Sequence, residues 1–173
     1  MPRMHENSMI TPERSTILIV CIGNDIVADD AVGYHLYHAL NASGLPPDVK
    51  TLYLAVGGIN LLNHLDGSEQ AIIVVDAVKF GNKPGTIVKS QWNSLPLPLH
   101  SPVSIHGIGL REVFEIVPVL YPGKYTDNIF FIGIEGAEFN QCGAGLSPDV
   151  ANAVEKAILI IHETIELLQE VIQ

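Results

Sequence analysis

Two aspartates and one histidine in this sequence combine residue types that can hold a divalent metal. Asp30 lies in the loop after a short apolar run, Asp76 ends a second apolar run, and His106 stands where a helical pattern begins. Carboxylate oxygens and an imidazole nitrogen bind divalent transition metals, and three protein ligands leave positions open for water or a substrate. These residues therefore predict a site that polarises a carbonyl group or activates water.

Each of these residues, taken alone, also has a structural explanation. Asp29 and Asp30 are both placed to cap the helix that follows them, and a histidine at a helix start is more often structural. A buried Asp76 would need a partner for its carboxylate. The prediction depends on the fold, because 46 residues separate Asp30 from Asp76 and 30 more separate Asp76 from His106.

The elements that must position these residues are short strands alternating with helices. Strands are predicted over residues 16–22, 51–56, 71–75, 86–89 and 128–134, the fourth pairing back as a hairpin at the sheet edge. Helices are predicted from Asp29, Ile59, Ile105 and Pro148, with the third stopped by Pro118. This alternation predicts an α/β fold, a single domain with a twisted, mostly parallel sheet of about five strands and helices on both faces. In such sheets ligands bind outside the carboxyl ends of the strands, where the three candidates lie.

Composition bounds the class of protein and excludes several functions. Within 173 residues we expect a flexible leader over residues 1–15 and one domain over residues 16–173. Nine basic against 19 acidic residues give a net charge of −10, which disfavours nucleic-acid binding. The apolar runs are far shorter than the roughly 20 residues that span a bilayer, and the first residues lack the apolar stretch of a secretory signal. We expect a cytoplasmic protein without membrane insertion or disulfides, since Cys21 and Cys142 form no CxxC pair.

Five motifs in order resemble the hydrogenase maturation protease family. They are Ile-Gly-Asn-x4-Asp-Asp-x2-Gly at 22–33, Gly-Gly with Leu-Leu at 57–62, Val-Val-Asp-Ala at 74–77, Ser-Ile-His at 104–106 and Gly-Leu-Ser at 145–147. The resemblance covers nearly the whole chain from Ile17 onward. It implies a twisted sheet of about five strands between helices.

The resemblance also implies an activity, a partner and a set of site residues. Members of the family are endopeptidases that trim a C-terminal extension from the large-subunit precursor of [NiFe] hydrogenases. Asp30, Asp76 and His106 match the family's catalytic and nickel-binding positions. The implied metal is nickel carried by the precursor, and Zn²⁺ or Cd²⁺ can occupy the same site in a purified sample. Cys21 stands where the family usually has glycine, and Gly136 where proline is common.

Two other functions remain open at this point. A relative that had lost catalysis would bind nickel and the precursor without cutting, as a chaperone. A phospho-acceptor module of the response-regulator type also carries an acidic pair after its first strand and an aspartate after its third. Here, however, the pair lies beyond a six-residue loop, and acids follow the last strand where such modules have a lysine. A dinucleotide site is disfavoured because the first turn lacks the glycine triplet.

Overall fold

The computed structural model describes residues 15–55, 58–95 and 107–172. The predicted leader lies outside these residues except for Ser15, and so does His106. The elements, in order, are β1 (Thr16–Ile22), the 3-10 helix η1 (Ala28–Ala31), α1 (Val32–Ser43), β2 (Val49–Leu54), η2 (Gly58–Asn63), β3 (Glu69–Val78), β4 (Ile87–Gln91), η3 (Trp92–Ser94), α2 (Gly107–Leu120), η4 (Pro122–Lys124), β5 (Ile129–Glu135) and α3 (Pro148–Ile172). Among the described helices, none combines the length and apolar character that crossing a membrane requires.

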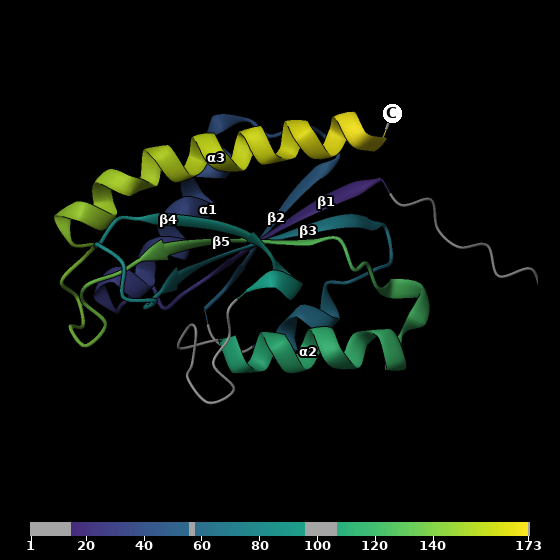
Figure 1. Cartoon of the computed structure of the whole chain (residues 1–173), viewed down its shortest axis with the longest axis horizontal. Helices are drawn as coiled ribbons and strands as arrows, with labels where there is room; N and C mark the ends of the chain where they lie inside the picture. Colours follow the sequence, from purple (N-terminus) through teal and green to yellow (C-terminus); the bar gives the residue numbers. More distant parts are fainter. Residues whose placement is uncertain (1–14, 56–57, 96–106, 173) are drawn as a thin grey trace, which may run out of the picture.

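The strands form one mixed sheet in the order β2-β1-β3-β5-β4. All neighbouring pairs are parallel except β4 and β5, which are antiparallel. Figure 1 shows α3 and α2 on opposite sides of this sheet. The predicted fold class, a mostly parallel five-stranded α/β sheet with helices on both faces, is therefore confirmed.

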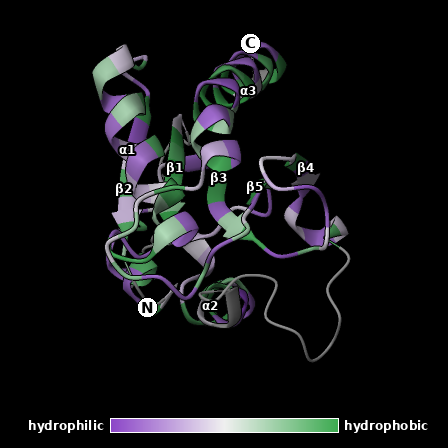
Figure 2. Cartoon of the chain, turned by 90° about the vertical axis from the view of Figure 1, so that its left-hand side faces the viewer, coloured by the Kyte–Doolittle hydropathy of each residue, from purple (hydrophilic) through white to green (hydrophobic). Residues whose placement is uncertain are grey.

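Each face of the sheet has its own apolar core. Side chains alternate along a strand, so Ile17, Ile19 and Cys21 of β1 pack toward α1 and α3. Leu18 and Val20 pack toward α2 on the other face. Figure 2 shows the hydrophobic strands between these two helix layers. Helices on both sides thus explain why β1 is an unbroken apolar run, with all seven of its residues buried.

The structure corrects the predicted pairing of the fourth strand. β4 is at the edge of the sheet, as predicted, but it pairs with β5 rather than forming a hairpin with β3. The buried Glu135, at the end of β5, accounts for this arrangement. Its carboxylate accepts the Phe80 and Gly81 backbone N–H groups at 3.1 and 2.8 Å, and its own carbonyl accepts the Gly85 N–H at 2.8 Å. These hydrogen bonds tie the connection between β3 and β4 to the last residue of β5, which places β4 beside β5.

Several predicted boundaries were also wrong, for local reasons. β3 does not end at Asp76 but continues to Val78, so this aspartate is paired within the sheet, opposite Gly133 of β5. β2 begins at Val49 rather than at residue 51. α2 continues through Pro118 to Leu120, because a proline two residues from the helix end removes one late N–H without breaking the earlier turns.

Candidate active site

Asp30 and Asp76 both lie toward the carboxyl end of the sheet, on neighbouring elements. Asp30 belongs to η1, which follows β1, while Asp76 belongs to the adjacent strand β3. The two residues are almost fully buried, at 2% and 1% exposure. η1 contacts β3 directly. The fold thus brings the two carboxylate-bearing elements together across 46 positions of sequence, as the site prediction requires.

The third predicted residue, His106, lies outside the described residues, so its position remains a prediction. The residue after it, Gly107, begins α2. Asp76 shares the alternation of Val74 and Val78, which pack into the core beneath α2. The Asp76 side chain is therefore on the face of the sheet that α2 covers. The Cys21 side chain packs on the opposite face of the sheet. Having cysteine in place of the family's glycine therefore does not reduce the space next to Asp76.

A tight turn after β1 sets the place of Asp30. The Asn24 N–H donates to Asp30 Oδ2 at 3.0 Å. Gly23 has φ of +147°, and a Cβ at this position would overlap the backbone carbonyl of Asp30. A Cβ at Gly33 would similarly overlap the carbonyl of Ile22. The two glycines of the first motif thus allow the turn and α1 to pack directly on the end of β1.

Asp29 does not cap the helix, in contrast to the structural explanation given above. Its fully buried carboxylate accepts the backbone N–H groups of Ala137 and Glu138, each at 2.8 Å, and that of Ser147 at 2.6 Å. The Ser147 hydroxyl also donates to it, at 3.0 Å. Asp29 therefore joins the loop after β1 to the loop between β5 and α3. The N-cap position of α1 is held by Ala31 rather than by Asp30, and Ala31 makes no side-chain cap hydrogen bond.

Tyr53 is a residue of this region that sequence reasoning missed. Its hydroxyl donates to the Gly23 carbonyl at 2.8 Å, and its ring contacts Tyr34 and Tyr37 of α1. Burial, followed by the negative charge of Asp25, raises the pKa of the Tyr53 hydroxyl, so the group remains a donor at neutral pH. Thirty positions separate Tyr53 from Gly23, and no local pattern marks the bond.

Whether the site can hold a metal depends on more than the described residues, because His106 lies outside them. Within the described ranges, no group of three or more histidine, cysteine, aspartate or glutamate side chains is arranged to hold a metal ion. Asp30 and Asp76 supply two carboxylates, and oxygen donors of this kind suit a divalent cation. A third ligand would have to come from the region that includes His106 or from the substrate itself.

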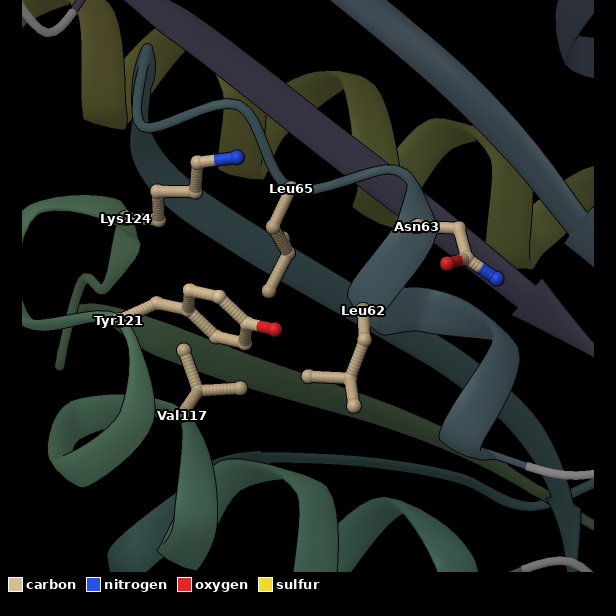
Figure 3. Close-up of a pocket in the computed structure, with 6 residues that line it drawn as sticks. All are labelled: Leu62, Asn63, Leu65, Val117, Tyr121 and Lys124. Carbon is tan, nitrogen blue, oxygen red and sulfur yellow. The ribbon is translucent and has the colours of Figure 1, made fainter.

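A separate hollow of about 230 Å³ lies at the other end of the sheet. Its lining comes from η2, the segment before β3, the end of α2, and η4: Leu62, Asn63, Leu65, Val117, Tyr121 and Lys124. In Figure 3 the Leu62, Leu65 and Tyr121 side chains point toward one another across it. Leu65 and Lys124 precede the first residues of β3 and β5, so this hollow is remote from the two buried aspartates.

Comparison with known proteins gives a consistent family. A family model described as hydrogenase maturation protease matches residues 34–164. A hydrogenase expression/formation protein, HupD from Rhodobacter capsulatus, is 32% identical over 85% of this chain and 69% of its own length. Among solved structures, the [NiFe] hydrogenase maturation protease HybD from Thermococcus kodakarensis aligns with a TM-score of 0.74 and 27% identity, covering 86% of this chain and 98% of that one.

The hydrogenase maturating endopeptidase HybD from Escherichia coli aligns equally well. Its TM-score is 0.74 and its identity 25%, over 90% of this chain and 93% of that one. The family match covers most of the chain, and the described elements form the sheet and helix layers that the motifs implied. The chain therefore belongs to the hydrogenase maturation protease family and is an endopeptidase of the hydrogenase maturation type.

Proposed function

We propose that this endopeptidase removes the C-terminal extension of a [NiFe] hydrogenase large-subunit precursor and recognises the nickel that the precursor carries. The observation that supports this most directly is the pair of buried carboxylates, Asp30 and Asp76, on contacting elements toward the carboxyl end of the sheet. The T. kodakarensis relative, described as a [NiFe] hydrogenase maturation protease, suggests the same class of substrate. The cytoplasm is the proposed place of action, as the sequence predicts.

In this proposal Asp30, Asp76 and His106 engage nickel that is already seated in the precursor. Two carboxylates held in a low-dielectric environment favour a divalent cation more strongly than they would in water. An imidazole adds a nitrogen donor suited to nickel. Because the metal arrives with the substrate, a precursor without nickel lacks the contact that aligns it. The enzyme thereby selects precursors whose metal insertion is complete.

The described side chains favour attack by water rather than by a covalent nucleophile. Burial raises the pKa of the Cys21 thiol to about 12, so it is not a thiolate at neutral pH. The Ser147 hydroxyl donates to Asp29 and makes no hydrogen bond to a histidine among the described residues. Hydrolysis then requires a water molecule, activated by a carboxylate of the site or by the substrate's nickel, next to the scissile peptide.

The test is incubation of the purified protein with nickel-loaded and nickel-free precursor, followed by intact mass measurement. We expect a C-terminal fragment to be lost only from the nickel-loaded form. Asp30→Ala, Asp76→Ala and His106→Ala are expected to abolish this loss, while Asp127→Ala, which removes an exposed carboxylate before β5, leaves it unchanged. Equal cleavage of both precursors would refute recognition through nickel.

Two further outcomes separate the parts of the proposal. Full cleavage by the Asp30, Asp76 and His106 variants would show that the site has been assigned to the wrong residues. Binding of the nickel-loaded precursor without any change of mass would contradict proteolysis and support a nickel chaperone of the same fold. Circular dichroism of each variant confirms that a loss of cleavage is not a loss of folding.

A further inference from the structure

One peptide group links the Tyr53 hydroxyl to the carboxylate of Asp30. Tyr53, in β2, donates to the Gly23 carbonyl at 2.8 Å. The N–H of the same peptide group belongs to Asn24, and it donates to Asp30 Oδ2 at 3.0 Å. The chain of contacts thus runs from the hydroxyl through a single peptide plane to the carboxylate. Both distances are those of well-formed hydrogen bonds.

Hydrogen bonds on both sides hold this peptide plane. Because Gly23 has no side chain, rotation about its Cα–C bond, which sets the orientation of the plane, has little steric restriction. A donor on the carbonyl side fixes the rotation of the plane and, by polarising it, strengthens the N–H as a donor to the carboxylate. The Tyr53 hydroxyl is the side-chain donor to that carbonyl among the described residues.

The Tyr53 ring is itself held by neighbours from α1. Tyr34 packs edge-on against it with ring centroids 5.4 Å apart, and Tyr37 contacts it at 5.9 Å. On the strand side, Tyr53 is in register with Cys21 of β1, two residues before Gly23. The hydroxyl is therefore carried on a ring with little freedom to move away from the turn.

We propose that Tyr53 is a positioning residue that orients the Asp30 carboxylate, through the Gly23–Asn24 peptide, toward nickel in the precursor. This inference rests on the proposed function, in which Asp30 contacts that metal. Outer contacts to a metal ligand commonly change affinity or activity 10- to 100-fold when they are removed. Tyr53→Phe removes only the hydroxyl, so we expect kcat/KM for nickel-loaded precursor to fall by about 10- to 100-fold.

Tyr37→Phe is the matched control. It deletes the same atom from the same aromatic cluster, but the Tyr37 hydroxyl makes no hydrogen bond to the described residues. We expect this variant to keep wild-type kcat/KM. Both variants should bind nickel-free precursor as the wild type does, because the positioning role concerns the contact to the metal alone.

Amide NMR supplies a readout that a general packing role would not move. Loss of the Tyr53 hydroxyl should shift the Asn24 amide proton upfield, as its hydrogen bond to Asp30 weakens, while Tyr37→Phe leaves that resonance in place. The inference is overturned if the Asn24 resonance is unchanged in Tyr53→Phe, or if kcat/KM of Tyr53→Phe stays within twofold of the wild-type value. It is also overturned if kcat/KM of Tyr37→Phe falls as much as that of Tyr53→Phe. A wild-type protein that does not process nickel-loaded precursor would instead refute the proposed function.

Discussion

Removing the Asp29 carboxylate should destabilise the fold strongly, although this residue belongs to a 3-10 helix of only four residues. The side chain is fully buried and accepts three backbone N–H groups and one hydroxyl from the segment that leads into α3. Because that segment connects β5 to the last helix, Asp29 holds two distant parts of the chain together. Asp29→Ala leaves all four donors without their acceptor.

The arrangement of the four contacts predicts a graded series. Ser147→Ala removes only the hydroxyl, which costs about 1 kcal/mol. Asp29→Asn can keep its oxygen at the Oδ2 position, where three donors converge, and loses the Ser147 N–H contact at Oδ1, for about 2 kcal/mol. Asp29→Ala leaves three backbone N–H groups without an acceptor, and at roughly 1 to 1.5 kcal/mol each the free energy of unfolding falls by about 4 kcal/mol. Asp25→Asn changes an exposed carboxylate of the same loop and should stay within about 0.5 kcal/mol.

Urea unfolding monitored by Trp92 fluorescence measures the series. This single tryptophan packs edge-on against Phe114 and Phe131 on the opposite face of the sheet, so it reports global unfolding rather than the altered loop. A free energy of unfolding for Asp29→Ala within about 1 kcal/mol of the wild type would refute the reasoning. So would an Asp29→Asn that costs less than Ser147→Ala. Even if the alanine variant does not fold, those two milder variants still test the order.

Two further predictions concern other buried groups. In the unfolded chain the Cys21 thiol ionises above pH 9, whereas burial in the folded protein raises its pKa to about 12. The thiol's contribution to stability is therefore complete below pH 9 and is lost as the pH rises to 12. Between pH 9 and 12 the free energy of unfolding of the wild type should therefore fall by about 1.4 kcal/mol more per pH unit than that of Cys21→Ala. Urea unfolding across this pH range measures both, and an equal fall in the two proteins would contradict the prediction. Glu135→Gln keeps one side-chain oxygen, which stays at the Oε2 position where the Phe80 N–H and the Asn82 amide both donate, and puts an NH2 group at the Oε1 position. The Gly81 amide then loses its acceptor and should exchange hydrogen about tenfold faster, whereas the exposed control Glu138→Gln leaves that rate unchanged.

The strands were predictable where burial and local pattern agree. β1 is apolar from Ile17 to Ile22 and covered on both faces, and its predicted bounds match the structure. β3 was predicted too short, over residues 71–75 of its apolar run, whereas the strand also includes Glu69 and Asp76. Both acids are buried inside the strand, and the Glu69 carboxylate accepts the N–H groups of Asp66 and Gly67. A polar residue marks a strand end only when no partner for it lies nearby.

The candidate site was predictable in part, because topology rather than local sequence brings its residues together. Parallel strands align their carboxyl ends, which allowed Asp30 and Asp76 to be grouped before the fold was known. The contacts of Asp29 and Tyr53 were not predictable, since their partners lie 108 to 118 and 30 positions away. His106, outside the described residues, remains a prediction that rests on the family resemblance and on its place before α2.

The adjacent acids of the first motif take different roles because of the helix that carries them. Consecutive side chains of a 3-10 helix diverge by about 120°. In η1 this divergence directs Asp29 toward the β5–α3 loop and Asp30 back toward the Gly23–Asn24 turn. All four close donors at Asp29 come from the protein itself, which makes it a structural residue and agrees with assigning the proposed role at the metal to Asp30. A one-residue change in the loop between Gly23 and Asp29 would leave an acid in only one of these two directions and an alanine in the other, so the loop length is as much a part of the arrangement as the acids.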